Sequence, residues 1–422
     1  MIPDSRPRRP VKQTGRPPRQ LLAGLFDRAL EAVGGRQSVR RALKARSIDM
    51  PVTLIAVGKA AQSMTEGAWD VLGERIRGGL VISKPGHLAP ERLARFSLEG
   101  IEGGHPVPTE GSLSAGRRLQ EVLEEAGEET LLFLISGGAS SLVEVPVSGL
   151  GLSDLARLNE WLLGSGLPIE AMNLVRKSVS LIKGGGLLAA LGGRRVRALA
   201  ISDVPGDDLR VIGSGLLVPE HDLASRLAAL DLPDWLRDWT DRGLMERAGI
   251  PARGPEIELV ATLDVAKDRA VAAAEAAGVE AHLHREFLEG DAAERGRDLA
   301  NRLIEGQVGL HIWGGETTVQ LPASPGRGGR NQHLALAAAV GLAGRDDCFL
   351  LSAGTDGTDG PTEDAGALVD GGTLERGGLE GRDSGSALAA ADAGSFLAAS
   401  GDLLHTGPTG TNVMDLVLGL RL

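Results

Sequence analysis

The chain has few residues that could form disulfide bonds or a cysteine-based metal site. Of its 422 residues one is cysteine, none is tyrosine, and aromatic residues make up only 3%. A single cysteine excludes an internal disulfide and any multi-cysteine metal site. Cys348 lies in an apolar run, so we expect it to be buried. The lack of tyrosine excludes a phenol as catalytic acid or base.

Long apolar runs are missing as well. No stretch approaches the ~20 apolar residues that span a bilayer, and no basic segment leads into an apolar export signal. We therefore expect a cytoplasmic protein without a membrane partner. Residues 1–20 are proline-rich and hold six basic residues against one aspartate, and we expect them to form a disordered tail. The net charge of −11 argues against a nucleic-acid partner.

Glycine is abundant, with 60 residues, and it gathers in short clusters between apolar runs. This pattern is typical of ligand-binding loops rather than of disordered linkers. Strands are predicted over 52–57, 79–83, 131–135 and 196–202, with helices over about 21–33, 59–72, 110–126 and within 153–191. Alternating strands and helices predict a Rossmann-like parallel sheet with helices on both faces, which binds ligands at the carboxyl ends of its strands.

Residues 231–255 interrupt this alternation and are interpreted as an interdomain crossing. A second α/β set is predicted beyond them. Its strands lie near 256–262, 279–284, 308–313 and 347–353, and its helices near 264–277, 290–305, 330–343 and 409–420. The sequence thus predicts two α/β lobes that face a cleft. The first lobe spans 21–235, and the second, smaller lobe spans 256–422 and has a mixed sheet.

The loop after the strand 131–135 contains only serine, glycine and alanine. Such a loop at the carboxyl edge of a parallel sheet offers backbone N–H groups and hydroxyls to phosphate oxygens. An ordinary tight turn is the alternative. The predicted phosphate-binding residues are Ser136, Gly137, Gly138, Ala139, Ser140 and Ser141.

Two cations stand where helices are predicted to start. Lys59 follows the first strand, and Arg330 opens the helix near 330–343. A cation is unfavourable at this end of a helix dipole unless an anion binds there. We therefore interpret both as anion-binding residues, with a solvated side chain as the alternative for Lys59. His105 lies in a glycine–proline loop before Thr109, the predicted N-cap, and is expected to hold that loop.

Carboxylates end two further strands. Asp203 follows the strand 196–202, where it could hold Mg²⁺ together with phosphate oxygens. Asp356 and Asp359 lie in a glycine-rich loop after the strand 347–353, and either could accept a hydroxyl proton. Of the two we choose Asp356.

Seven motifs occur in one order along the chain: Val-Gly-Lys-Ala-Ala, Gly-Gly-His-Pro-x-Pro, Ile-Ser-Gly-Gly-Ala-Ser-Ser-Leu, Ser-Asp-Val-x-Gly-Asp, Gly-Gly-Glu-Thr-Thr-Val, Gly-Gly-Arg-Asn-Gln and Ala-Gly-Thr-Asp-Gly-x-Asp-Gly-Pro. In these motifs the chain resembles the two-domain glycerate 2-kinases, whose carboxyl-terminal part is the MOFRL domain. The resemblance covers everything from about residue 20 onward.

The resemblance implies ATP- and Mg²⁺-dependent phosphorylation of D-glycerate at its 2-hydroxyl, giving 2-phosphoglycerate. It also implies that the active site lies in the cleft between the two lobes, and that Lys59 and Arg330 match an active-site lysine and arginine of the family. The partners are then a small acid and a nucleotide, and a homodimer is left open. Two alternatives remain: an NAD(P)H-dependent hydroxypyruvate reductase, for which the usual dinucleotide fingerprint is missing, and a non-catalytic phosphate or sugar-acid binder.

Overall fold

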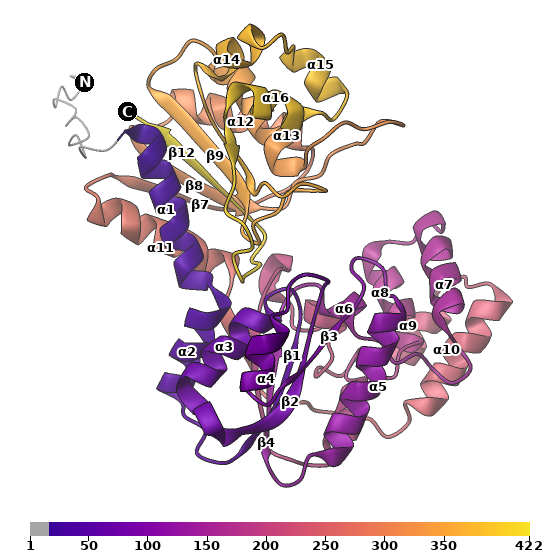
Figure 1. The fold of residues 1–422 in the computed structure, drawn as a ribbon. Coiled ribbons are helices and arrows are strands. Elements are labelled where there is room, and N and C mark those ends of the chain that lie inside the picture. The colour runs from indigo at the N-terminus through magenta and orange to yellow at the C-terminus, as the bar shows by residue number, and fades with distance from the viewer. Residues whose placement is uncertain (1–16) are drawn as a thin grey trace, which may run out of the picture. The chain divides into compact units, whose positions relative to one another are not determined.

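The computed structural model describes residues 17–422, which divide into two units (Figure 1). The N-terminal unit comprises Gly34–Thr262 and Gly410–Asn412. The C-terminal unit comprises 17–33, Leu263–Thr409 and Val413–Leu422. The tail predicted over 1–20 falls largely outside the described residues, but its last three positions are helical, since α1 starts at Pro18. Proline is well tolerated at the first turn of a helix.

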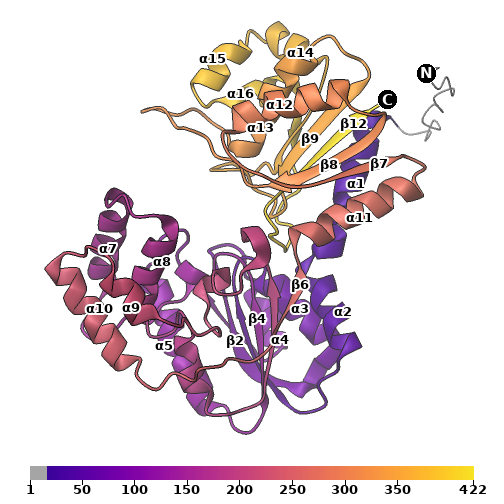
Figure 2. The same cartoon turned by 180° about the vertical axis from the view of Figure 1, so that it is seen from behind.

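The N-terminal unit is built on a six-stranded, fully parallel sheet in the order β3-β2-β1-β4-β5-β6. Every residue of β1 and β4 is buried, as expected for strands covered on both faces. Figures 1 and 2 show α2 and α3 on one face and α5 on the other. The elements are α2 (Gly35–Ala45), β1 (Val52–Val57), α3 (Ala61–Leu72), β2 (Ile76–Ser83), α4 (Pro90–Arg95), β3 (Glu99–Glu102), α5 (Glu110–Glu125), β4 (Thr130–Ile135), α6 (Ala139–Leu142), α7 (Leu152–Gly164), α8 (Ile169–Ser178), β5 (Val196–Ile201), α9 (Leu223–Ala228), α10 (Asp234–Glu246) and β6 (Ile257–Ala261), with short 3-10 turns at Gly73–Arg75, Gly186–Leu191, Pro205–Asp207 and Ile212–Ser214.

Helices α7 to α10 form a cluster with a small apolar core of their own, separate from the core under the sheet. Residues 231–255, predicted as an interdomain crossing, therefore contain a helix of the N-terminal unit: Leu236 of α10 is fully buried in this cluster. Thr109 is the N-cap of α5, which confirms that prediction.

The C-terminal unit is built on a mixed six-stranded sheet in the order β11-β10-β9-β12-β8-β7. Only β7 and β8 pair in parallel. Its elements are α1 (Pro18–Val33), α11 (Leu263–Ala276), β7 (Ala281–Leu288), α12 (Ala292–Glu305), β8 (Gly309–Gly315), α13 (Arg330–Leu342), β9 (Cys348–Gly354), β10 (Gly366–Asp370), α14 (Thr373–Leu379), α15 (Ser384–Ala389), α16 (Ala393–Ser400), β11 (Leu403–Leu404) and β12 (Asp415–Arg421). The predicted class, two α/β units with a parallel and a mixed sheet, is confirmed, and Cys348 is fully buried as expected.

Three sequence-based assignments are wrong. The helix predicted over 409–420 is the strand β12, which lies inside the sheet between β8 and β9. The strand predicted to open the second lobe is β6, which pairs with β5 at the edge of the first sheet. Residues 21–33, assigned to the first lobe, form most of α1, which packs on α11, β9 and β12 of the C-terminal unit. A short apolar run does not specify helix or strand, nor which sheet it joins.

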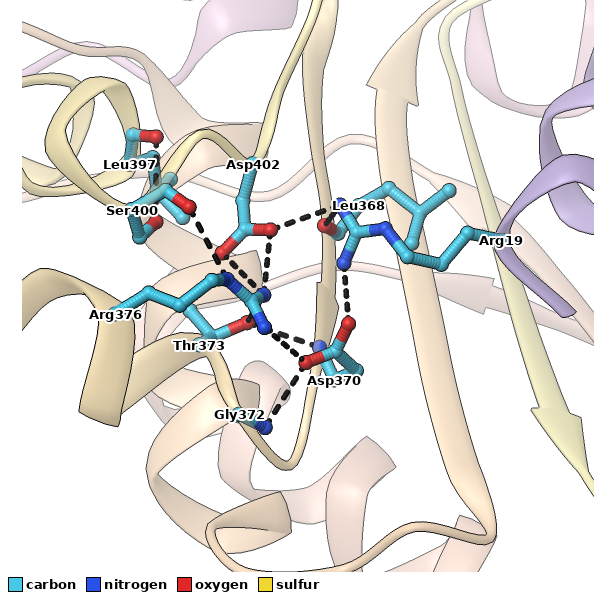
Figure 3. Close-up of polar contacts among 9 residues, drawn as sticks. All are labelled: Arg19, Leu368, Asp370, Gly372, Thr373, Arg376, Leu397, Ser400 and Asp402. Carbon is cyan, nitrogen blue, oxygen red and sulfur yellow. Dashed lines mark hydrogen bonds and ion pairs between the residues drawn. The ribbon is translucent and has the colours of Figure 1, made fainter. Parts of the chain in front are cut away.

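A cluster of ion pairs attaches the start of α1 to the C-terminal unit (Figure 3). The Arg19 guanidinium donates to Asp370, to Asp402 (2.8 Å) and to the carbonyl of Leu368 (2.8 Å). Arg376 donates to the same two carboxylates. Asp402 is almost fully buried, so its charge needs these partners.

Candidate active site

The loop after β4 is locked to the start of α3. The Ser136 N–H donates to the Val57 carbonyl (2.9 Å), and its Oγ accepts a hydrogen bond from the Ala60 N–H (3.0 Å). Gly58 has no room for a side chain, because a Cβ there would lie 2.1 Å from Ser136 Oγ. Ser136 is fully buried, so its hydroxyl fixes the loop instead of facing a ligand.

The two glycines are the part of the loop best suited to an anion. Within residues 17–422, the N–H groups of Gly137 and Gly138 donate to no other protein group. A Cβ on Gly137 would lie 1.9 Å from Asp203 Oδ2, and Gly138 has a φ of 83°, so glycine is required at both positions. Ala139 is buried in the single turn α6, whereas Ser140 is partly exposed.

Lys59 lies beside this loop. Its N–H donates to the Gly137 carbonyl (2.9 Å), and its Cγ is 3.4 Å from where a Cβ on Gly138 would be. The N-cap of α3 is Ala60 and the helix starts at Ala61, so Lys59 lies two residues before the helix that the sequence predicts to begin at 59. The lysine and the glycine amides belong to one cluster.

Asp203 joins the same cluster from the carboxyl end of β5. Its Oδ2 accepts a hydrogen bond from the Asn412 amide (3.2 Å). Sequence reasoning missed Asn412 because it assigned this stretch to a helix of the second lobe. In the part of the chain that the structure describes, no three His, Cys, Asp or Glu side chains form a metal site. One carboxylate beside the Gly137 and Gly138 amides still suits Mg²⁺, which takes one or two carboxylates and completes its shell with phosphate oxygens and water.

A cavity of about 310 Å³ opens on the other end of the loop. One wall contains His105 and Ser141, whose Nδ1 and Oγ lie 3.0 Å apart, together with Ser140. His105 therefore links its glycine–proline loop to the loop after β4, and it also lines the cavity. The remaining lining residues are Pro106, Pro108, Glu144, Leu155, Leu158, Asn159, Asn173, Arg176, Val179 and Lys183.

In the C-terminal unit, Arg330 is paired with two carboxylates of the protein, Asp415 and Glu316. Its Nε and Nη2 donate to the two oxygens of Asp415 (2.6 and 3.0 Å), and its Nη1 lies 3.1 Å from Glu316 Oε1. Burial opposes the charge, but the hydrogen bonds and charge of Asp415 raise the pKa of Arg330 above its usual value. The Arg330 side chain is 34% exposed and that of Asp415 only 5%. Part of the Arg330 side chain thus remains accessible.

Asp359 caps α13. Its carboxylate accepts hydrogen bonds from the N–H groups of Asn331 (3.0 Å) and Gln332 (2.8 Å). Burial raises its pKa to about 7, although these two hydrogen bonds act in the opposite direction. With 2% exposure, Asp359 supports the helix and is not available to a substrate.

Asp356 is partly exposed and lies in the turn after β9. Its Oδ1 accepts hydrogen bonds from the N–H and the hydroxyl of Thr358 (both 3.0 Å). A Cβ on Gly354 would lie 3.4 Å from Asp356 Oδ1 and 3.6 Å from Asp415 Oδ1. Asp356 therefore lies close to the Arg330–Asp415 pair. The predicted residues form two clusters, one in each unit: Lys59, the 136–141 loop and Asp203, and separately Arg330 and Asp356.

Comparison with known proteins places this architecture in a family. Residues 21–234 match the model described as "Domain of unknown function (DUF4147)", and residues 309–415 match the MOFRL family. A D-glycerate 2-kinase of Thermotoga maritima is 38% identical over 95% of this chain and 98% of its own length. A protein of Agrobacterium vitis with a provisional hydroxypyruvate reductase name is 36% identical over 94% and 93%.

Among solved structures, the Thermotoga maritima glycerate kinase superposes with a TM-score of 0.85 at 37% identity, over 96% of this chain and 99% of that one. Shared motifs, similarity over nearly the whole length and a common fold agree. The chain belongs to the glycerate kinase family with a C-terminal MOFRL domain.

Proposed function

We propose that the protein transfers the γ-phosphoryl group of ATP to the 2-hydroxyl of D-glycerate, giving 2-phosphoglycerate and ADP. The observation that carries this proposal is the pair of free N–H groups at Gly137 and Gly138, flanked by Lys59 and Asp203, in a chain of the glycerate kinase family. These groups are what a polyphosphate chain requires: converging donors, a cation and a carboxylate for a metal.

In the N-terminal cluster, the amides of Gly137 and Gly138 bind phosphate oxygens and Lys59 neutralises their charge. Asp203, oriented by Asn412, is the residue that would hold Mg²⁺. When bound, Mg²⁺ supplies charge neutralisation on the β- and γ-phosphate oxygens. Ser136 and Ala139, also predicted to contact the nucleotide, contribute by shaping the loop.

In the C-terminal cluster, Arg330 stabilises the negative charge on the phosphoryl group during transfer, and Asp356 accepts the proton of the 2-hydroxyl. The hydroxyl oxygen forms the new bond to the γ-phosphorus while the bond to the β–γ bridging oxygen breaks. Because phosphoryl transfer depends mainly on positioning and charge stabilisation, a weak base such as a carboxylate suffices.

Hydroxypyruvate reduction is the second candidate, since two relatives carry that name provisionally. It would need a nicotinamide site, but the chain has no G-x-G-x-x-G after a strand with an acid ~20 residues later. A non-catalytic phosphate binder is the third candidate.

No helix of the described chain is long and apolar enough to cross a membrane. The cytoplasmic location stays a prediction.

A coupled assay separates these candidates. The purified protein is given D-glycerate, ATP and Mg²⁺, and ADP formation is recorded. A parallel reaction contains hydroxypyruvate and NADH without ATP. We expect ADP and 2-phosphoglycerate in the first reaction and no NADH oxidation in the second. NADH consumption without ADP formation would support the reductase, and inactivity in both would support the binder.

A further inference from the structure

Two cationic side chains, Lys183 and Arg176, line the cavity beside Ser140 and Ser141, and they differ in their partners. Lys183 is paired with Glu144 inside the protein, where both side chains are almost fully buried. Glu144 also accepts from the Ser180 hydroxyl (2.6 Å) and the Val145 N–H (3.0 Å). Lys183 and Glu144 therefore satisfy each other and form a fixed wall of the cavity.

Arg176 has no such partner. Its Nη1 donates to Asn173 Oδ1 (3.2 Å) and its Nη2 to Asn159 Oδ1 (3.0 Å), and both acceptors are neutral. Among residues 17–422 no carboxylate lies within ion-pair distance of Arg176. The guanidinium is half-buried, and this burial lowers its pKa.

A half-buried cation held only by neutral groups is unfavourable in the empty protein. The two asparagines use two of the five N–H donors of the guanidinium and fix its plane. The remaining donors form the fork that matches a carboxylate, whose two oxygens can accept two parallel hydrogen bonds. An anionic ligand in this cavity would offset the charge that the protein leaves uncompensated.

We propose that Arg176, oriented by Asn159 and Asn173, binds the carboxylate of the small 2-hydroxy acid. This inference rests on the proposed function, because it names the residue that recognises the acid as distinct from the nucleotide. The loop after β4 then serves two ligands. Its glycine end binds phosphate oxygens, and its Ser140–Ser141 end borders the acid, whose 2-hydroxyl is adjacent to its carboxylate.

The test uses Arg176→Gln, which removes the charge, and Arg176→Lys, which keeps the charge but not the fork. Arg242→Gln is the matched control. Arg242 belongs to α10 of the same helical cluster, but its guanidinium donates to the Ser148 carbonyl (2.8 Å) and does not line the cavity.

Steady-state kinetics are measured with D-glycerate and ATP varied in turn. We expect Arg176→Gln to raise the KM for D-glycerate on the order of 100-fold, the worth of a bidentate charged contact. We expect Arg176→Lys to raise it less, and the KM for ATP to change little in both. A wild-type KM for D-glycerate in Arg176→Gln, or an equal rise in the KM for ATP, would overturn the inference. If Arg176→Gln does not fold, Arg176→Lys provides the same comparison.

Calorimetry with 3-hydroxypropionate gives a readout without turnover, since this acid keeps the carboxylate but lacks the 2-hydroxyl. Wild type and Arg242→Gln should bind it, Arg176→Gln should not, and glycerol should bind to none. If wild type phosphorylates no glycerate, the proposed function fails. Calorimetry still decides the role of Arg176, because equal binding to wild type and Arg176→Gln, or none to wild type, contradicts it.

Discussion

Lys59 and Arg330 are both cations beside a helix start, but their surroundings make their expected mutant behaviour different. Arg330 forms two hydrogen bonds to a buried carboxylate, Asp415, and therefore contributes to the fold of its unit. Lys59 lies at the edge of a glycine-rich loop whose geometry is fixed by Ser136. The sequence predicts a cation that needs an anion in both cases, but it does not show that Asp415 and Glu316 are the anions beside Arg330.

Replacing Lys59 by alanine should remove activity and leave the fold intact. We expect kcat/KM to fall by orders of magnitude, about 10²-fold or more for loss of a charge at the transferring phosphoryl group, with the melting temperature unchanged. Steady-state kinetics and thermal unfolding on the same sample check both parts. A variant with near-normal kcat/KM would remove Lys59 from the mechanism.

Replacing Arg330 by alanine should reduce both activity and stability, because it leaves Asp415 buried without its partner. Since the Arg330 side chain is a third exposed, solvent screens part of the effect. We expect the free energy of unfolding to fall by about 1–2 kcal/mol. Adding Asp415→Asn should restore most of the melting temperature but none of the activity. If the double variant regains turnover, Arg330 acts only through the fold.

At the level of elements, strands with both faces covered and helices with clear caps are predicted well. The runs 52–57 and 131–135 are continuous apolar segments bounded by turn residues, and they form β1 and β4 with small shifts at their ends. β12 has a similarly apolar sequence, but its assignment depends on pairing with β8 and β9, which are distant in sequence. Arg176 was missed for a related reason: Asn173 precedes it on α8, but its second acceptor, Asn159, belongs to α7 and is brought to it only by the fold.

The cap of α13 should make stability depend on pH. The pKa of Asp359 is raised to about 7 in the folded protein from an ordinary value near 3.8. Between these pH values the folded state keeps a proton that the unfolded state has lost, so stability falls as the pH rises from about 4 to 7. Asp359→Asn cannot titrate and should melt with a flatter pH profile.

Thermal unfolding from pH 4 to 8 measures this difference. Asp346→Asn, an exposed aspartate of the same unit, controls for the loss of one negative charge. If the profiles of wild type and Asp359→Asn run parallel, the carboxyl of Asp359 does not change its protonation in this range.

At the level of the whole molecule, each unit is assembled from segments that are separated in the sequence. α1 precedes the N-terminal unit along the chain but packs in the C-terminal one. Residues 410–412 lie between two segments of the C-terminal unit along the chain but pack in the N-terminal one. No local pattern in 21–33 carries this information, because an amphipathic helix specifies an apolar partner but not which one.

The C-terminal unit should consequently be incomplete without α1. Six apolar residues of this helix are buried, among them Leu22 and Phe26. Burial of a side chain as large as these two contributes up to about 2–3 kcal/mol. We expect a fragment of residues 263–422 to bind a hydrophobic dye and to melt without a sharp transition. A synthetic peptide of residues 17–33 should restore cooperative unfolding, whereas the same peptide with Leu22→Asp and Phe26→Ala should not. A peptide with Arg19→Gln should bind more weakly, since it loses the contacts to Asp370 and Asp402. Cooperative melting of the fragment alone would show that α1 is dispensable for this unit.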